Sequence, residues 1–429
     1  MLRKIDTHLL QPGMFLQELC GTWIDHPFWR TSFKLKDAGE IAKIINSGIK
    51  EALIDTDKGL DVEVATVDAP PPVQARPPAA PQPAKAARPA YTPIEAEMER
   101  ASSIVAESKK AVVSMFNEAR MGKAIEADNV MPLVKDISSS VARNPGALIS
   151  IARLKTADDY TYMHSVAVCG LMIALARQLN LDEAQTREAG MAGLLHDVGT
   201  MAIPLEVLNK PGKLTDDEFT LVKGHPAAGH EMLVNGHGVG ETALDVCLHH
   251  HEKIDGSGYP HKIAGDAISL FARMGAVCDI YDAVTSERPY KKGWDPAEAV
   301  HKMATWSKGH FDERIFQAFV KSVGIYPVGS LVRLQSGRLG VVIEQSPSSL
   351  LVPRVKVFFS VKSQMRLPPE VVDLARPTAN DCIVAQEDPA KWGFADLNVL
   401  WGGNKAATYT PVATQTPPLM ATSKSPSRR

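Results

Sequence analysis

The chain has 429 residues, of which 45% are hydrophobic and 22% are charged, and its formal net charge is -2. This length exceeds what one ordinary core needs, so two or three domains are expected. The near-neutral charge gives no electrostatic reason to expect a nucleic acid polymer or an anionic membrane as a partner. No uninterrupted apolar run reaches the ~18–20 residues that span a bilayer.

The cellular compartment can be inferred from the cysteines and the first residues. The five cysteines are scattered and form no CxxC pair, which suits a reducing compartment. Residues 1–15 lack the continuous apolar region of a signal peptide. These features predict a cytoplasmic protein.

Residues 1–68 are predicted to form a small mixed α/β domain of unknown role. Strands are expected over 14–19 and 51–56, and an amphipathic helix over 37–49. Residues 69–93 are rich in proline and alanine and contain almost no large apolar residue. Such a segment cannot bury enough surface to fold, so we predict an extended linker.

From residue 94 onward the patterns are helical. Residues 94–127 read as a connecting helix with apolar positions at helical spacing; it could pack onto the next domain or form a dimer contact, so a homodimer stays open. Residues 128–325 are predicted to be entirely helical, with single helices over 160–180, 183–199, 216–233 and 270–286. Residues 326–401 alternate like strands and predict a small β appendage. The tail, 402–429, has the composition of a disordered segment.

Seven side chains in the helical region are candidate metal ligands. They are His164, His196, Asp197, His225, His250, His251 and Asp279. Imidazole and carboxylate suit borderline first-row metals, and successive helices could direct these groups at one centre. Two metals about 3.5–4 Å apart would clamp an in-line phosphoryl displacement. Asp197, unlike a single imidazole nitrogen, could bridge them.

The chain resembles a known family at four motifs. HD at 196–197, HHE at 250–252, DGSGYP at 255–260 and CDIYDAVTSERPYK at 278–291 are similar to the HD-GYP family of cyclic di-GMP phosphodiesterases. The resemblance covers roughly residues 130–325. The first domain resembles an uncharacterised N-terminal domain often joined to HD-GYP domains. The resemblance implies a mainly α fold, the helical HD-domain bundle, with the small α+β domain before it and the β appendage after it.

The same resemblance implies an activity and a site. The seven side chains above would bind two divalent ions, iron or manganese, and the catalytic pair would be His196 and Asp197. A metal-bound hydroxide would attack phosphorus, converting cyclic di-GMP to pGpG and on to GMP. Arg288 and Lys291 would hold the substrate's phosphate and guanine. The loop Gly258, Tyr259, Pro260 would shape the site and could dock diguanylate cyclase (GGDEF) domains.

The chain departs from the family pattern at two positions. Thr200 stands where the family's HDxGK motif has a phosphate-contacting lysine; Lys210, Lys213 and Lys223 follow it in sequence. Tyr160 stands where some members have a glutamate that completes a third metal site, so two metals are expected. Within the DIYD run, Asp279 is expected to be the ligand and Asp282 to orient a histidine, while His249 falls outside the HHE pair. A cyclic di-GMP sensor without activity, or another HD-type nucleotide hydrolase, remain alternatives.

Overall fold

The structure of this chain is a computed structural model. It describes residues 2–20, 33–60 except 36, 38, 40, 42–43 and 46–50, and then 91–154, 160–210, 212–286, 293–346 and 349–407. The chain divides into two compact units, residues 1–87 and 88–429, and each is described here by itself.

The first unit contains a four-stranded antiparallel sheet. Its strands are β1 (Leu2–Asp6), β2 (Phe15–Cys20), β3 (Phe33–Lys34) and β4 (Glu51–Asp55), in the order β1-β4-β2-β3. Met14, Leu16, Leu35, Ile44 and Ile54 form its core. The two predicted strands are confirmed. The predicted helix over 37–49 falls on residues described only in part. Residues 69–90 of the predicted linker over 69–93 lie outside the described residues.

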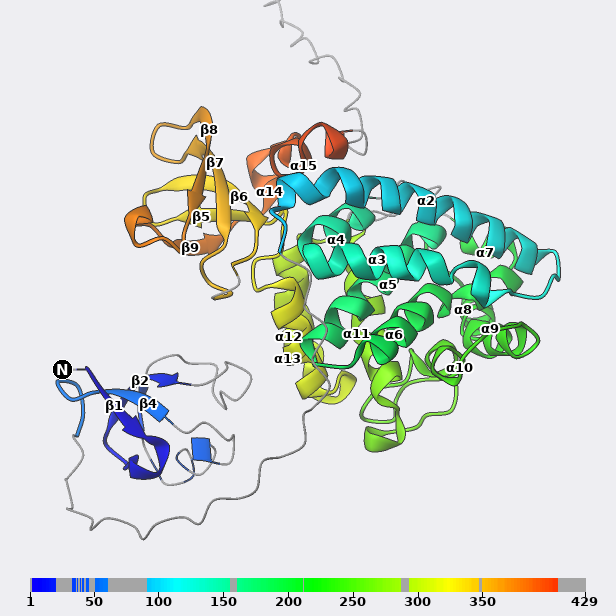
Figure 1. The fold of residues 1–429 in the computed structure, drawn as a ribbon, viewed down its shortest axis with the longest axis horizontal. Helices are drawn as coiled ribbons and strands as arrows, with labels where there is room; N and C mark the ends of the chain where they lie inside the picture. The colour runs from blue at the N-terminus through cyan, green and yellow to red at the C-terminus, as the bar shows by residue number, and fades with distance from the viewer. Residues whose placement is uncertain are drawn as a thin grey trace, which may run out of the picture. The chain divides into compact units, whose positions relative to one another are not determined.

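The second unit is a helical bundle, as predicted for residues 128–325 (Figure 1). Its helices are α2 (Ile94–Arg120), α3 (Met131–Arg143), α4 (Pro145–Arg153), α5 (Tyr160–Gln178), α6 (Glu183–Leu195), the 3-10 turn η5 (Val198–Ala202), α7 (Leu205–Leu208), α8 (Asp216–Val222), α9 (His225–Val234), α10 (Glu241–His249), α11 (Leu270–Thr285), α12 (Pro296–His310) and α13 (Glu313–Val323).

Helix α5 is the centre of this bundle. Every residue from Met163 to Ala176 is buried, since α3, α4, α6, α11 and α13 surround the helix. This explains why its sequence is apolar on all sides and not only along one stripe. A polar residue within this stretch of α5, such as His164, is therefore buried wherever it points.

The prediction of one helix over 216–233 is wrong, because two helices meet there. Helix α8 ends at Val222 with Lys223 as its C-cap, and α9 starts at His225 with Gly224 as its N-cap. Pro226 stands in the first turn of α9, where its missing N–H leaves no hydrogen bond unmade. The break places His225 at the first position of α9, where its side chain is buried.

The β appendage is a five-stranded antiparallel sheet followed by two helices. The strands are β5 (Leu331–Leu334), β6 (Arg338–Glu344), β7 (Arg354–Ser360), β8 (Met365–Asp373) and β9 (Ile383–Gln386), in the order β8-β7-β6-β5-β9. Helices α14 (Pro389–Trp392) and α15 (Leu397–Ala407) follow. The helical backbone of α15 is interrupted at Gly403, one residue after the predicted start of the tail, and residues 408–429 lie outside the described residues.

Glu344, at the end of β6, ties the appendage to the start of α2. It is 4% exposed. Its Oε1 accepts hydrogen bonds from the Tyr91 hydroxyl at 2.6 Å, the Ile94 N–H at 3.0 Å and Asn144 Nδ2 at 3.2 Å. Arg354 donates to its other oxygen. Pro93, the N-cap of α2, has no side-chain cap bond of its own, so Glu344 satisfies an otherwise free N–H of the first turn.

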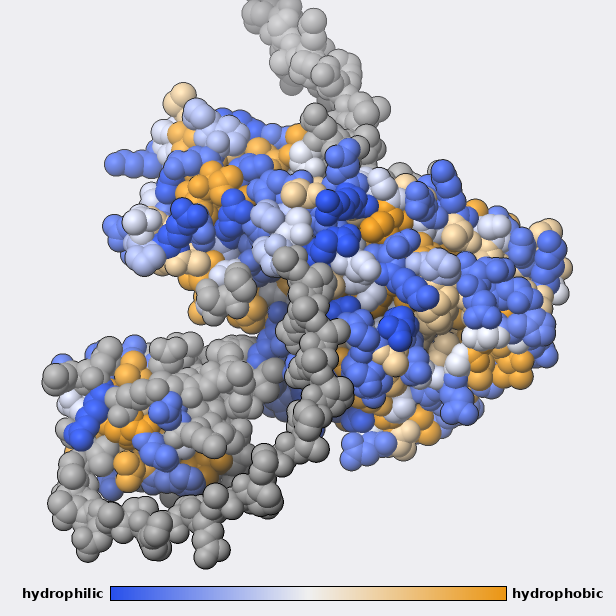
Figure 2. All heavy atoms as spheres, in the orientation of Figure 1, coloured by the Kyte–Doolittle hydropathy of each residue, from blue (hydrophilic) through white to orange (hydrophobic). Residues whose placement is uncertain are grey.

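The visible face of the second unit is mostly hydrophilic, with small hydrophobic patches between polar side chains (Figure 2). Among the described helices, none has both the length and the apolar character that crossing a bilayer requires.

Candidate metal centre

The structure brings the seven candidate ligands together from five segments of the bundle. His164 comes from α5, and His225 and Asp279 come from α9 and α11. The remaining ligands lie at the ends of helices. His196 is the C-cap of α6, Asp197 precedes η5, His250 is the C-cap of α10, and His251 follows it.

The first group of ligand atoms consists of His164, His196 and Asp279. One ligand atom from each lies within 4.8 Å of the others. Nε2 of His164 is 3.0 Å from Oδ1 of Asp279, and Nε2 of His196 is 4.0 Å from the same oxygen. All three residues are buried.

The second group consists of His225, His250 and His251, which meet the same 4.8 Å criterion. The Nε2 atoms of His225 and His250 are 3.3 Å apart. Two imidazoles whose Nε2 atoms face each other at this distance can share one proton or bind one cation.

Asp197 lies between the two groups and gives one oxygen to each. Its Oδ1 is 3.1 Å from Nε2 of His225 and 3.8 Å from Nε2 of His250. Its Oδ2 is 3.8 Å from Nε2 of His164 and 4.0 Å from Nε2 of His196. This division between two oxygens is the arrangement that a bridging carboxylate needs.

The outer nitrogens of four histidines are held by acceptors. Nδ1 of His164 bonds Asp282 at 2.6 Å, as expected from the sequence. Nδ1 of His196 bonds the Gly193 carbonyl at 2.9 Å, Nδ1 of His225 the Val222 carbonyl at 2.8 Å, and Nδ1 of His250 the carbonyls of Val246 and Cys247 at 3.0 Å. A carbonyl only accepts, so Nδ1 of His196, His225 and His250 carries a proton. Nε2 of His196 and His250 is then left with a lone pair directed inward, as metal-binding histidines have.

The donor set fits divalent metal ions. Nε2 of His196 is buried and has no hydrogen-bond partner among the described residues, and an orphaned buried acceptor of this kind is uncommon unless something binds it. Five imidazoles and two carboxylates are the donors that iron, manganese and related first-row ions accept.

Electrostatics in the ligand-free centre divides the histidines into two kinds. Burial lowers the pKa of His196, holds the pKa of His250 well below its usual range and lowers the pKa of His251 to about 4. Burial also acts against a charge on His164, but the hydrogen bonds that its ring donates to Asp279 and Asp282 outweigh it and raise its pKa to about 9. Burial at His225 is likewise outweighed by the hydrogen bond to Asp197, which raises the pKa of His225. Three imidazoles are therefore neutral and ready to ligate near pH 7, while His164 must first lose a proton.

The loop that carries Gly258, Tyr259 and Pro260 folds back onto the centre. The Tyr259 ring stacks on His251 with 4.7 Å between centroids, and the Tyr259 N–H donates to the His251 carbonyl at 3.2 Å. A Cβ at position 258 would lie 2.5 Å from Cα of Glu252, so only glycine fits there.

Glu252 holds the end of this loop in place through hydrogen bonds, a role that was not predicted from the sequence. The side chain is 2% exposed, and its Oε1 accepts the N–H groups of His261 at 2.6 Å and Lys262 at 2.9 Å. Its place directly after the histidine pair was a usable signal, because a buried acid beside two ligands needs donors. His249 points away from the centre, to Asp245 at 2.7 Å and His261 at 3.1 Å, as its exclusion from the HHE pair predicted.

The two departures from the family pattern have defined surroundings. Thr200 is 9% exposed and donates its hydroxyl to the Asp197 carbonyl at 2.7 Å, so it braces the backbone of a ligand and supplies no cation. Tyr160 stacks on His164 with 5.6 Å between ring centroids and offers a ring face where a carboxylate would be a ligand. Arg288 and Lys291 lie outside the described residues.

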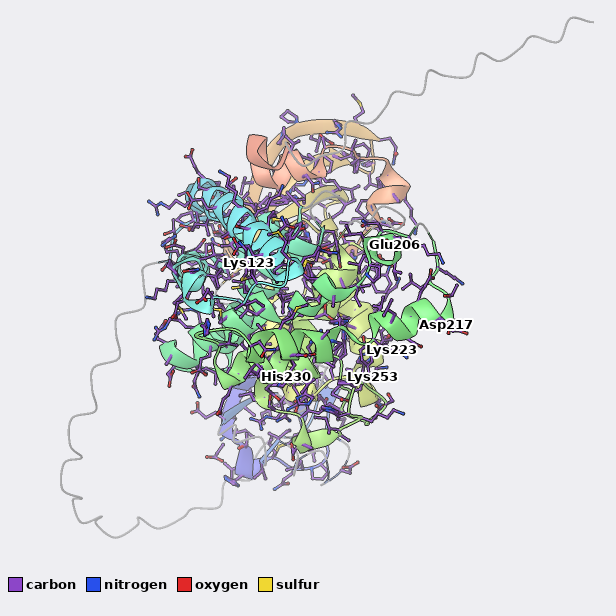
Figure 3. All side chains as sticks on the ribbon, turned by 90° about the vertical axis from the view of Figure 1, so that its right-hand side faces the viewer. Lys123, Glu206, Asp217, Lys223, His230 and Lys253 are labelled. Carbon is purple, nitrogen blue, oxygen red and sulfur yellow. The ribbon has the colours of Figure 1, made fainter. Side chains whose placement is uncertain are left out.

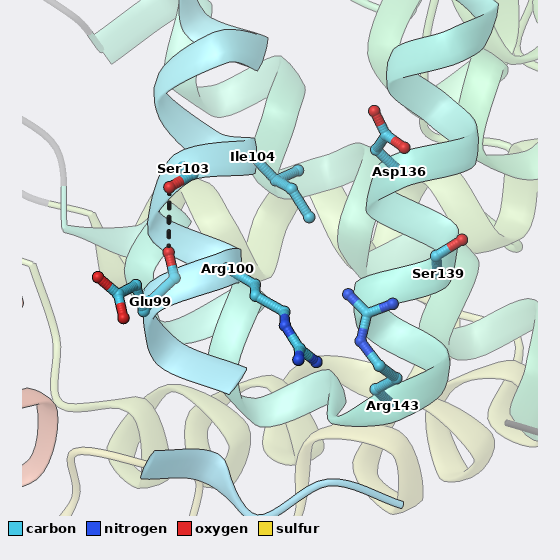
Figure 4. A pocket seen from close by; sticks show the side chains of 7 residues that line it. All are labelled: Glu99, Arg100, Ser103, Ile104, Asp136, Ser139 and Arg143. Atoms are coloured by element: carbon cyan, nitrogen blue, oxygen red, sulfur yellow. Dashed lines mark hydrogen bonds between the residues drawn. The ribbon is translucent and has the colours of Figure 1, made fainter. Parts of the chain in front are cut away.

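A separate shallow hollow lies between α2 and α3 (Figure 4). Its lining comprises Glu99, Arg100, Ser103, Ile104, Asp136, Ser139 and Arg143. Arg143 donates to the buried carboxylate of Glu97 at 2.8 and 2.7 Å, and Nη1 of Arg100 is 3.7 Å from it. Glu97 pairs with both guanidinium groups, and Glu99 and Asp136 also line the hollow, so the hollow gives no reason to expect an anionic ligand.

Comparisons with known proteins agree with this geometry. A family described as HD domain matches residues 139–315, and one described as a domain of unknown function (DUF3391) matches residues 2–130. The cyclic di-GMP phosphodiesterase PA4108 of Pseudomonas aeruginosa is 54% identical over 409 residues, which cover 95% of this chain and 97% of that protein. The cyclic di-GMP phosphodiesterase response regulator RpfG of Xanthomonas campestris is 44% identical over 156 residues, which cover 36% of this chain and 40% of that protein.

Among solved structures, the HDG"Y"P protein Bd1817 of Bdellovibrio bacteriovorus is 17% identical, with a TM-score of 0.44, and the match covers 75% of this chain and 99% of that one.

The helical bundle and its buried histidine–aspartate centre define an HD-domain protein. The chain is 54% identical to PA4108 over nearly the full length of both proteins, and it contains the motifs HD, HHE and GYP. It therefore belongs to the HD-GYP family of cyclic di-GMP phosphodiesterases. The family predicted from the sequence is confirmed.

Proposed function

We propose that this chain hydrolyses cyclic di-GMP to the linear dinucleotide pGpG, and pGpG on to GMP, in a reaction that depends on divalent metal ions. The observation that carries the proposal is the centre itself. Two groups of ligand atoms face each other, and the two oxygens of Asp197 are divided between them. A relative that is 54% identical over 97% of its length is named a cyclic di-GMP phosphodiesterase.

The seven side chains are proposed as the ligands of two ions, with iron or manganese as the ions in the cell. One ion would be held by His164, His196 and Asp279, and the other by His225, His250 and His251, with Asp197 shared. When bound, such ions neutralise charge that develops on the phosphoryl oxygens and lower the pKa of water.

The chain's own residues prepare the centre for that chemistry. Asp282 and the backbone carbonyls fix the tautomers of four histidines. Desolvation keeps His196 and His250 unprotonated. The Tyr259 ring covers one face of His251 and excludes water from that side, which strengthens electrostatic interactions within the site.

The substrate is proposed to meet Arg288, Lys291 and the loop of Gly258, Tyr259 and Pro260. A guanidinium forks onto phosphate and can bond a guanine edge, whereas an ammonium acts as a point charge. The docking of GGDEF domains on this loop, a homodimer and a cytoplasmic location all stay predictions.

The test is a product assay on protein purified without oxygen. The protein is loaded with iron(II) or manganese(II), its metal content is measured, and cyclic di-GMP is added. Chromatography is expected to show pGpG first and GMP later. Asp197→Ala, prepared identically, serves as the inactive control. Intact cyclic di-GMP with two ions bound per chain would contradict the proposal.

One observation favours a second function, a sensor that binds cyclic di-GMP without cleaving it. The Thr200 hydroxyl donates a hydrogen bond to the Asp197 carbonyl, so residue 200 places no positive charge near a phosphate of the substrate. The same assay separates the two functions, because a sensor would bind cyclic di-GMP in equilibrium dialysis and return it unchanged. The full set of ligand-type side chains favours the enzyme.

A further inference from the structure

Lys223 adjoins the metal centre through one aromatic ring. It closes α8, two residues before His225. Its Nζ is 4.4 Å from the ring centroid of Phe219 and 5.8 Å from that of Tyr259. The Tyr259 ring in turn stacks on His251 with 4.7 Å between centroids. Tyr259 therefore contacts both the Lys223 ammonium and an imidazole of the centre.

The charge of Lys223 has no acidic partner among the described residues. Lys210, which lies in the segment before α8, differs: its Nζ donates to Glu218 at 2.6 and 2.8 Å. Lys223 is only partly exposed, and it lies on the face of the bundle turned toward the viewer in Figure 3. Its ammonium is held by ring faces that attract a cation but do not neutralise it.

This arrangement suits an anion that arrives with the substrate. A cyclic dinucleotide carries two phosphodiester groups, each with one negative charge, and the centre can hold only one of them at its ligand atoms. The other anionic oxygens need partners at the rim. An ammonium with three donors on a flexible stem can follow a phosphate as the ring system turns.

We infer that Lys223 binds a non-bridging phosphodiester oxygen of the substrate at the rim formed by Tyr259. The inference rests on the proposed function and adds a substrate-binding residue to it. Tyr259 is then a positioning residue, because its ring lies 5.8 Å from the Lys223 ammonium and also stacks on His251.

The test compares three variants with the wild type. Lys223→Met keeps an apolar stem and removes the charge, Lys223→Arg keeps the charge, and Lys210→Met removes a paired lysine away from the rim. Initial rates on cyclic di-GMP with manganese are measured at several salt concentrations, with metal content determined for each protein. Dissociation constants for cyclic di-GMP are measured by calorimetry.

Lys223→Met is expected to raise KM and the dissociation constant about tenfold, the size of a lost charged hydrogen bond, with kcat nearly unchanged. Its KM should also depend less on salt, because screening acts on the missing charge. Lys223→Arg should restore most of the affinity, and Lys210→Met should behave as the wild type.

Two results would overturn the inference. One is a Lys223→Met protein whose affinity and salt dependence match the wild type. The other is a fall in kcat with unchanged KM and binding, which would place Lys223 outside substrate binding. If the wild type binds cyclic di-GMP but does not cleave it, the proposed enzymatic function fails, and the dissociation constants still decide the role of Lys223.

Discussion

Asp282→Asn tests how far the centre depends on a residue that binds no metal itself. The Asp282 carboxylate is 2% exposed and holds Nδ1 of His164 at 2.6 Å. Asparagine keeps the shape and can accept the same N–H, but it removes the charge that makes His164 a strong donor. Loss of such an outer partner weakens metal affinity by about 10- to 100-fold, equivalent to about 1.4–2.7 kcal/mol.

The chain offers a matched control for this substitution. His249 bonds Asp245 through Nδ1 at 2.7 Å, a more exposed carboxylate–histidine pair outside the centre, so Asp245→Asn removes the same charge from a pair that contains no candidate ligand. Metal affinity is measured by competition with a coloured chelator, and hydrolysis is followed as manganese is titrated. Asp282→Asn should shift the half-saturating manganese concentration upward, with most of kcat recovered at saturation.

The reasoning is refuted if Asp282→Asn and the wild type reach half-saturation at the same manganese concentration. It is equally refuted if Asp245→Asn shifts this concentration as much as Asp282→Asn does. That result would mean that any carboxylate–histidine pair in this region affects the metal through general stability.

Three further predictions concern the centre. Asp197→Ala should lose both metals and at least 100-fold in kcat, as measured by metal analysis and product formation; retention of two ions would disprove the bridging role. Metal binding should release a proton from His164, whose pKa is raised to about 9. Apparent metal affinity should then rise about tenfold from pH 7 to pH 8. The same shift stabilises the metal-free fold fully below pH 6.5, and this contribution is lost as pH rises through about 9. Gly199→Ala should displace α9 and cost about 1–3 kcal/mol, since its Cβ would lie 2.0 Å from the His225 carbonyl oxygen. Gly240→Ala, whose Cβ meets nothing within 4 Å, is the control, and metal content with Tm distinguishes the two.

Much of the site could be predicted because ligand chemistry restricts residue type. All seven candidate ligands converge in the structure, and the expected partner of His164 is in place. What could not be predicted depends on tertiary contacts. The acceptors of the outer nitrogens are mostly backbone carbonyls, which no sequence pattern marks. Lys223 and Lys210 look alike in sequence, and only the structure separates the paired lysine from the one beside Tyr259.

The strands that the sequence did not reveal share one physical property. β1, β3, β8 and β9 lie at the edges of their sheets, where one side of the backbone has no neighbouring strand among the described residues. β8 contains two consecutive prolines and is largely exposed. Proline is tolerated at an edge because its missing N–H can face outward. The strand β4, by contrast, lies between β1 and β2. It could be predicted because three of its five residues are buried and its central residues are accordingly apolar.

The bond between Glu344 and the start of α2 bears on how the chain folds during synthesis. The Ile94 N–H and its acceptor are separated by 250 residues, so the first turn of the long helix emerges from the ribosome well before the group that caps it. Contacts this far apart in sequence form late and slowly. Truncated chains that end at the last bundle helix would contain every candidate ligand, yet leave α2 frayed at its first turn and Asn144 without one of its acceptors. The β appendage therefore stabilises the first turn of α2 only after it has itself been synthesised. Metal content and activity should accordingly be measured on a chain that includes this appendage.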